Sequence, residues 1–153
     1  AAARSETQAE RLDRNWSSLL QELRVTQTGV QLLTGFLLTL PFQARFAQLG
    51  TDLHIVYLMT VACSLAATVL LVAPVAMHRL LFRRHRLNTV VSVSHRCAYI
   101  GLLLLGTALT GVAIVVFGAV LGVGAGSVAG AVTALAMLSA WVAFPLWQRH
   151  RSA

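Results

Sequence analysis

The sequence has very little charge for its length. Only 11% of its 153 residues are charged, against about a quarter in soluble domains, while 57% are hydrophobic. Lysine is absent, so all 12 basic residues are arginines, and only five residues are acidic. This composition excludes an ordinary soluble domain and predicts an integral membrane protein.

Acidic residues are missing from the middle of every apolar stretch. Glu22 and Asp52 stand at the ends of such stretches. Proton-coupled transporters usually bury a carboxylate at mid-membrane, so this composition disfavours that class. The two cysteines, Cys63 and Cys97, are too few for a disulfide framework. Zinc-ligand spacing, a phosphate-binding glycine loop and a serine–histidine–acid set are also missing, so the sequence predicts neither an enzyme nor a cofactor.

Residues 5–24 predict an amphipathic helix that precedes the first apolar stretch. Five large apolar side chains share one face by helical spacing: Leu12, Trp16, Leu19, Leu20 and Leu23. Such a helix can lie among lipid headgroups with its tryptophan as an anchor. The uncharged run 25–44 is about long enough to cross a bilayer, although its first half is polar, and Pro41 is expected to end it.

Three further crossings are predicted, which makes four in all. The second follows Asp52, a residue that favours the N-cap of a helix. The uncharged run 97–148 would be roughly 75 Å long as one helix, against a hydrocarbon core of about 30 Å, so the chain must turn back. The glycines within 122–126 supply that turn.

The predicted fold is therefore all-α, a polytopic membrane protein with an amphipathic N-terminal helix. Its predicted parts are an interfacial segment 1–24, a four-helix transmembrane bundle 25–148 with spans of about 25–44, 53–77, 97–121 and 127–147, and a cytoplasmic tail 149–153. With four crossings, eleven arginines lie on one side and only Arg45 on the other. The positive-inside rule then predicts that both termini are cytoplasmic.

A basic loop joins the second and third spans. We expect its arginines either to contact anionic lipid headgroups or to serve only as a topology signal: Arg79, Arg83, Arg84 and Arg86. Aromatic residues do not alternate with them, as binding of single-stranded nucleic acid would require. The net charge of +7 therefore predicts no nucleic-acid partner.

Polar side chains follow one face of the first span. By helical spacing this face carries Gln27, Thr28, Gln31 and Thr34. Hydrocarbon cannot satisfy amide groups, so we expect these side chains to face protein or water. Packing by interhelical hydrogen bonds, contact with a partner subunit, and the lining of a pathway are the open alternatives.

Small residues mark a further packing face on the last two spans. Gly111, Gly118 and Gly122 share one face of the third span, and Gly126 and Gly130 share one face of the fourth. Small residues allow helix backbones to approach closely, so these two helices are expected to pack together. Contact between copies of the chain is the alternative.

Two histidines lie at similar depth on adjacent spans. His78 ends the second span and His95 opens the third, so they are weak candidates for holding a haem or a metal. Neither has a neighbouring carboxylate to orient it, as ligating histidines usually have. The alternative is a pair of interfacial histidines with solvated tips.

Two segments carry a resemblance to a known family. Residues 11–43 begin RLDRNWSSLLQELR and end LLTLPFQ, and residues 73–84 read APVAMHRLLFRR. Both are similar to a family of short actinobacterial membrane proteins of unknown function. The resemblance implies four membrane helices in an actinobacterial inner membrane and transfers no site residues.

The expected function is that of a non-enzymatic membrane protein, either an oligomer or an accessory or structural subunit of a larger membrane complex. Its partners would be the lipid bilayer, anionic headgroups, and further copies or other membrane subunits. A small oligomeric transporter or channel for an ion or solute is the first alternative. A haem-binding redox membrane protein is the second.

Overall fold

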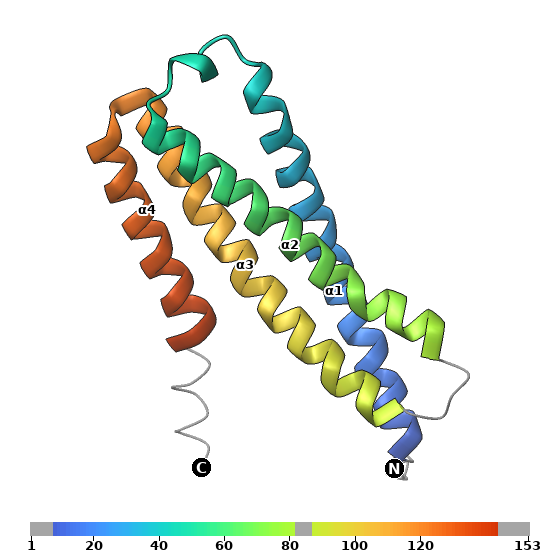
Figure 1. Ribbon diagram of the computed structural model, residues 1–153. Coiled ribbons are helices and arrows are strands. Elements are labelled where there is room, and N and C mark those ends of the chain that lie inside the picture. The colour runs from blue at the N-terminus through green and yellow to red at the C-terminus, as the bar shows by residue number, and fades with distance from the viewer. Residues whose placement is uncertain (1–7, 82–86, 144–153) are drawn as a thin grey trace.

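The computed structural model describes residues 8–81 and 87–143, which are helical almost throughout (Figure 1). The four long helices are α1 (Gln8–Thr39), α2 (Thr51–Leu81), α3 (Leu87–Leu121) and α4 (Val123–Leu138). Two short 3-10 turns, η1 (Leu40–Phe42) and η2 (Phe46–Gln48), join α1 to α2, and a π-helical turn, η3 (Ser139–Ala143), follows α4. No strand occurs in the described ranges, so the all-α prediction is confirmed.

Three helices are long and apolar enough to cross a membrane. Within the described residues these stretches are Thr51–Met77, Val93–Leu121 and Val123–Trp141. Helix α1 is not among them, because glutamine and threonine residues occupy much of the part that lies beside α2. Composition therefore supports three of the four predicted crossings.

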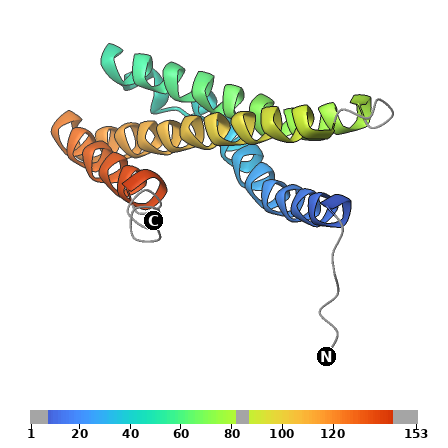
Figure 2. The same ribbon diagram turned by 90° about the horizontal axis from the view of Figure 1, so that it is seen from below.

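Helices α2 and α3 form an antiparallel pair at the centre of the molecule. Helix α1 packs against α2, and α4 packs against α3 (Figure 1). Figure 2 shows the N-terminal part of α1 leaving the α2–α3 pair. In the described part of the chain α1 and α4 share no extensive contact, so the four helices form an open arrangement.

One face of α2 carries most of the core. Its buried residues alternate three and four positions apart: Leu53, Tyr57, Thr60, Ser64, Ala67, Leu71 and Pro74. Four buried positions of α3 lie seven residues apart: Ser94, Gly101, Ala108 and Val115. A period of 3.5 residues is that of left-handed helix packing, which keeps one seam facing its partner along the whole length.

Helix α1 is continuous through Arg24, so no break separates the amphipathic segment from the first apolar stretch. It ends at Thr39, two residues before Pro41, which lies within η1. Proline fits the first turn of a helix, where no N–H is needed, and it cannot continue the preceding one. The chain thus leaves α1 where the sequence predicted.

The turn between α3 and α4 is made by one residue. Gly122 has a φ of 95°, a left-handed conformation that glycine adopts without steric cost. Helix α4 therefore begins at Val123 and not at Ser127, and Gly126 lies within it. Asp52 also differs from its predicted role, since α2 begins at Thr51 and places this carboxylate in its first turn, near the positive end of the helix dipole.

Candidate functional site: the polar face of helix α1

Gln27 connects α1 to α2 beside a proline. Its Nε2 donates a hydrogen bond of 2.6 Å to the backbone carbonyl of Leu71. Pro74 lies three residues further along α2 and has no N–H, so the carbonyl of Leu70 lacks its helical donor and this turn is weakened. Membrane helices tolerate an internal proline when a neighbouring helix supplies polar groups. Gln27 therefore adds a hydrogen bond to the carbonyl next to the one that Pro74 leaves without its helical donor.

A second polar contact between the same two helices lies further toward the C-terminal end of α1. The hydroxyls of Thr34 and Ser64 are 2.5 Å apart, and both side chains are buried. The Thr34 hydroxyl also lies 2.7 Å from the carbonyl of Val30, to which it donates. Its proton thus goes to the backbone, so Ser64 acts as the donor between the two hydroxyls.

An aromatic cluster closes this interface at the end where α1 meets its linker. The Tyr57 hydroxyl donates to the carbonyl of Leu37 over 2.9 Å. Phe46 of η2 packs edge-on against the Tyr57 ring, at 4.9 Å between centroids, and against His54 at 4.7 Å. Leu37 is one of the last carbonyls of α1, which lack helical donors, so Tyr57 satisfies a group that hydrocarbon would leave unpaired.

Gln31 and Thr28 are both exposed on α1. The Thr28 hydroxyl donates to the carbonyl of Arg24, 3.0 Å away. The Gln31 amide makes no hydrogen bond with any residue that the structure describes. The predicted polar face is thus divided: Gln27 and Thr34 face α2, and Gln31 is available to a group outside the chain.

Glycines bring α3 and α4 into backbone contact. A Cβ atom on Gly126 would lie 2.7 Å from the carbonyl oxygen of Ile114 and 2.9 Å from the Cα of Gly118. A Cβ atom on Gly130 would overlap the Ile114 side chain. Only residues without a side chain fit at this crossing, which is the close approach that small residues permit.

The other predicted packing glycines have different neighbours. Gly111 faces the hydroxyl of Thr60 on α2, and a Cβ on Gly118 would point at Leu53, also on α2. Gly122 forms the turn and has open space around it. The glycines of α3 thus serve two neighbours, because this helix lies between α2 and α4.

Most of the predicted basic site lies outside what the structure describes. Three loop arginines fall outside the described residues: Arg83, Arg84 and Arg86. Arg79 and His78 belong to α2, but their side chains are not described. His95 is exposed on α3, and the described residues contain no group of three histidine, cysteine, aspartate or glutamate side chains that could hold a metal.

Tyr57 and Ser64 complete the polar interface and were not predicted. A signal for them exists in the sequence, since Tyr57, Thr60 and Ser64 are hydroxyl residues at helical spacing within an apolar span. All three are buried on one face of α2. Polar residues on a single face of an apolar helix indicate the side that packs against protein.

The fold and this interface define an all-helical protein with three helices apolar enough to cross a membrane and polar contacts between its helices. The chain belongs to the family of unknown function DUF6328, whose sequence profile matches residues 5–145. The match extends the resemblance from its two segments to nearly the whole sequence. No curated protein and no solved structure matches the chain.

Proposed function

We propose that this protein is a non-enzymatic membrane subunit that crosses the bacterial cell membrane four times and assembles with other membrane helices through the exposed polar face of α1. The observation that carries the proposal is the exposed amide of Gln31, which has no hydrogen-bond partner in the described chain. The assembly is either an oligomer or a larger complex in which the chain is an accessory or structural subunit.

The position of α1 beside α2 supports a fourth crossing. The two helices are joined at three levels, by Gln27 with Leu71, Thr34 with Ser64, and Leu37 with Tyr57. Gln27 and Leu37 are ten residues apart, about 15 Å along α1. This is half of the roughly 30 Å hydrocarbon core, and α2 is apolar enough to cross along the same stretch.

The arginine distribution supports the orientation. Helix α1 begins and α4 ends toward the end of the molecule at which α2 leads into α3 (Figure 1). The exposed side chains of Arg14 and Arg96 lie in the halves of α1 and α3 nearest this end, and Arg45 lies in the linker at the opposite end. With the arginine-rich end inside, both termini are cytoplasmic.

The hydrogen-bond pattern of α1 supports assembly. Gln27, Thr28 and Thr34 each donate a hydrogen bond within the chain, which leaves Gln31. Burying an amide without a partner costs on the order of 1–3 kcal/mol. A hydrogen bond to another helix would remove this cost, and the absence of a side chain at Gly35, four residues on and uncovered, permits close approach.

The test is the particle mass of purified protein in gentle detergent, for the wild type and for Gln31→Leu. We expect a wild-type particle larger than one chain and detergent, and loss of the added mass in Gln31→Leu with the melting temperature kept. Gln48→Leu is the matched control, because Gln48 is an exposed amide in η2, outside the apolar stretches. A monomeric wild-type particle, or equal assembly in Gln31→Leu, would contradict the proposal.

A further inference from the structure

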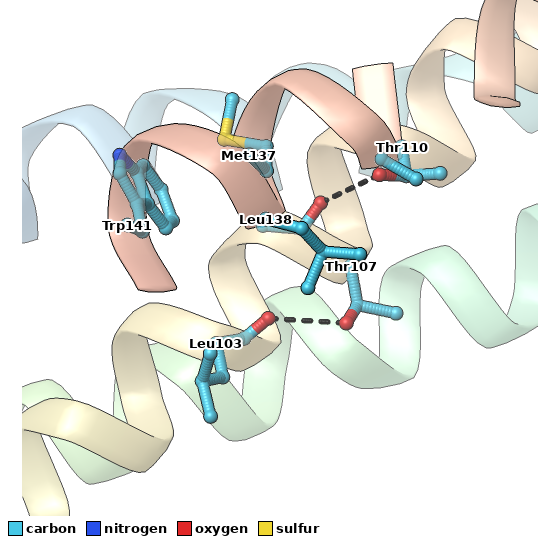
Figure 3. Close-up of a pocket in the computed structure, with 8 residues that line it drawn as sticks. Leu103, Thr107, Thr110, Met137, Leu138 and Trp141 are labelled. Atoms are coloured by element: carbon cyan, nitrogen blue, oxygen red, sulfur yellow. Dashed lines mark hydrogen bonds between the residues drawn. The ribbon is translucent and has the colours of Figure 1, made fainter. Parts of the chain in front are cut away.

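A narrow groove runs between α3 and α4 on the surface of the molecule. It encloses about 290 Å³, and its walls are formed by Leu103, Thr107, Thr110, Met137, Leu138 and Trp141 (Figure 3). Apart from the hydroxyls of its two threonines and the Trp141 indole N–H, these side chains are apolar. In a membrane such a groove is filled by hydrocarbon or by another apolar group.

The two threonines contribute no free hydrogen-bond donor to the groove. The Thr107 hydroxyl donates to the carbonyl of Leu103 at 3.0 Å, and that of Thr110 donates to the carbonyl of Gly106 at 2.9 Å (Figure 3). Each hydroxyl hydrogen is therefore used within α3. The floor of the groove suits an occupant without hydrogen-bonding groups, such as an acyl chain.

The groove is about two helical turns long. Leu103 and Thr110 are seven residues apart, about 10 Å along α3, and the space between the two helices there is about 290 Å³. Part of one extended hydrocarbon chain can lie along it.

Trp141 lines the groove at the end where α4 passes into η3. A Cβ atom on Gly106 would lie 3.2 Å from the Trp141 ring, so the indole lies directly over this glycine. Trp141 belongs to the π-helical turn Ser139–Ala143, which changes the direction of side chains relative to a regular helix. Because α4 runs antiparallel to α3, this is the end of the groove toward the start of α3 (Figure 1).

A cation lies beyond this end on the same face of α3. Arg96, Tyr99, Leu103, Thr107 and Thr110 recur three or four residues apart, so they form one stripe along the helix. Arg96 is exposed and makes no ion pair with a described residue, and Tyr99 is 52% exposed. From Arg96 to Thr110 the stripe is about 21 Å long.

We propose that this stripe and groove bind one anionic phospholipid. The Arg96 guanidinium donates to the phosphate, and one acyl chain lies over Leu103, Thr107 and Thr110 beside Met137 and Leu138. Charge complementarity identifies the headgroup, because a guanidinium prefers phosphate oxygens and the arginine-rich inner leaflet side attracts anionic lipid. The proposal rests on the membrane orientation given above and is independent of assembly through α1.

The test is native mass spectrometry of the full chain, released from detergent after incubation with anionic phosphatidylglycerol or zwitterionic phosphatidylcholine. We expect the wild type to retain one phosphatidylglycerol, with Thr107→Phe retaining at least ten-fold less because its ring fills the groove. Val69→Phe is the matched control, since Val69 is 68% exposed on α2 and does not line this groove. Leu138→Phe replaces Thr107→Phe if the latter fails to fold.

The headgroup contact is tested separately with Arg96→Gln. It should reduce the preference for phosphatidylglycerol over phosphatidylcholine about ten-fold, whereas Arg24→Gln on α1 should leave that preference unchanged. Equal lipid retention by Thr107→Phe and Val69→Phe would overturn the proposal, as would a wild type that retains a second copy of the chain in place of lipid. Gln31→Leu should keep the lipid, so failure of assembly and failure of lipid binding give different spectra.

Discussion

The contact between α3 and α4 depends on Gly126, which makes Gly126→Ala a sharp test of the fold. A methyl group there would lie 2.7 Å from the carbonyl oxygen of Ile114 and 3.0 Å from the backbone nitrogen of Gly118. Both are backbone atoms and cannot rotate away. Ordinary contact begins near 3.4 Å, so α4 must move from α3 by roughly 0.7 Å.

The size of the effect follows from that displacement. A gap of this size removes about a quarter to a half of the dispersion energy between facing atoms, and overpacked sites typically cost about 1–3 kcal/mol. Alanine also favours a helix over glycine by up to about 1 kcal/mol. Gly124→Ala is the control, because Gly124 lies in the same turn of α4 with nothing within 4 Å.

The measurement is reversible unfolding in mixed micelles, followed by loss of helical signal. Because the propensity gain is similar in both variants, the difference between them isolates the steric cost. We expect Gly124→Ala to be neutral or slightly stabilising and Gly126→Ala to be less stable than Gly124→Ala by about 1–3 kcal/mol. Equal stability of the two variants would show that α3 and α4 do not cross at these glycines.

Three further predictions concern the other interfaces and the orientation. Gly111→Ala places a methyl group against the Thr60 hydroxyl and should cost about 1–3 kcal/mol in the same assay, with most of the loss recovered by adding Thr60→Ala; no recovery would contradict this contact. Gln27→Leu should lower the free energy of unfolding by about 0.6–1.7 kcal/mol, and by less in a Pro74→Ala background, where α2 regains a backbone N–H. An equal loss in both backgrounds would show that the Gln27 hydrogen bond acts independently of the proline. In cells, a cysteine replacing Gln48 should react with an impermeant reagent from outside while one at the N-terminus is protected; the reverse would exclude four crossings with both ends inside.

The sequence by itself determined the secondary structure class and the apolar stretches, because both depend on local properties. Uninterrupted apolar runs must be helical in hydrocarbon, where every backbone polar group needs an internal partner. Pro41 and Gly122 act through their own backbone geometry, so the end of α1 and the turn before α4 were readable from single residues. The glycine-rich stretch 122–126 is longer than the turn. Gly122 alone makes the turn with its positive φ, and the other glycines of the stretch lie in α4.

Only the tertiary structure decided which polar and small residues face each other. Helical spacing placed Gln27 and Gln31 on one face, but the oblique path of α1 across α2 gives the first a partner in Leu71 and leaves the second exposed. The sequence also did not determine which helix Gly111 contacts, because α3 packs between α2 and α4 and has glycines on both of these sides. The position of a residue in the sequence sets which side of its helix it occupies. What that side contacts depends on how two helices cross, and this crossing is decided by all the contacts between them.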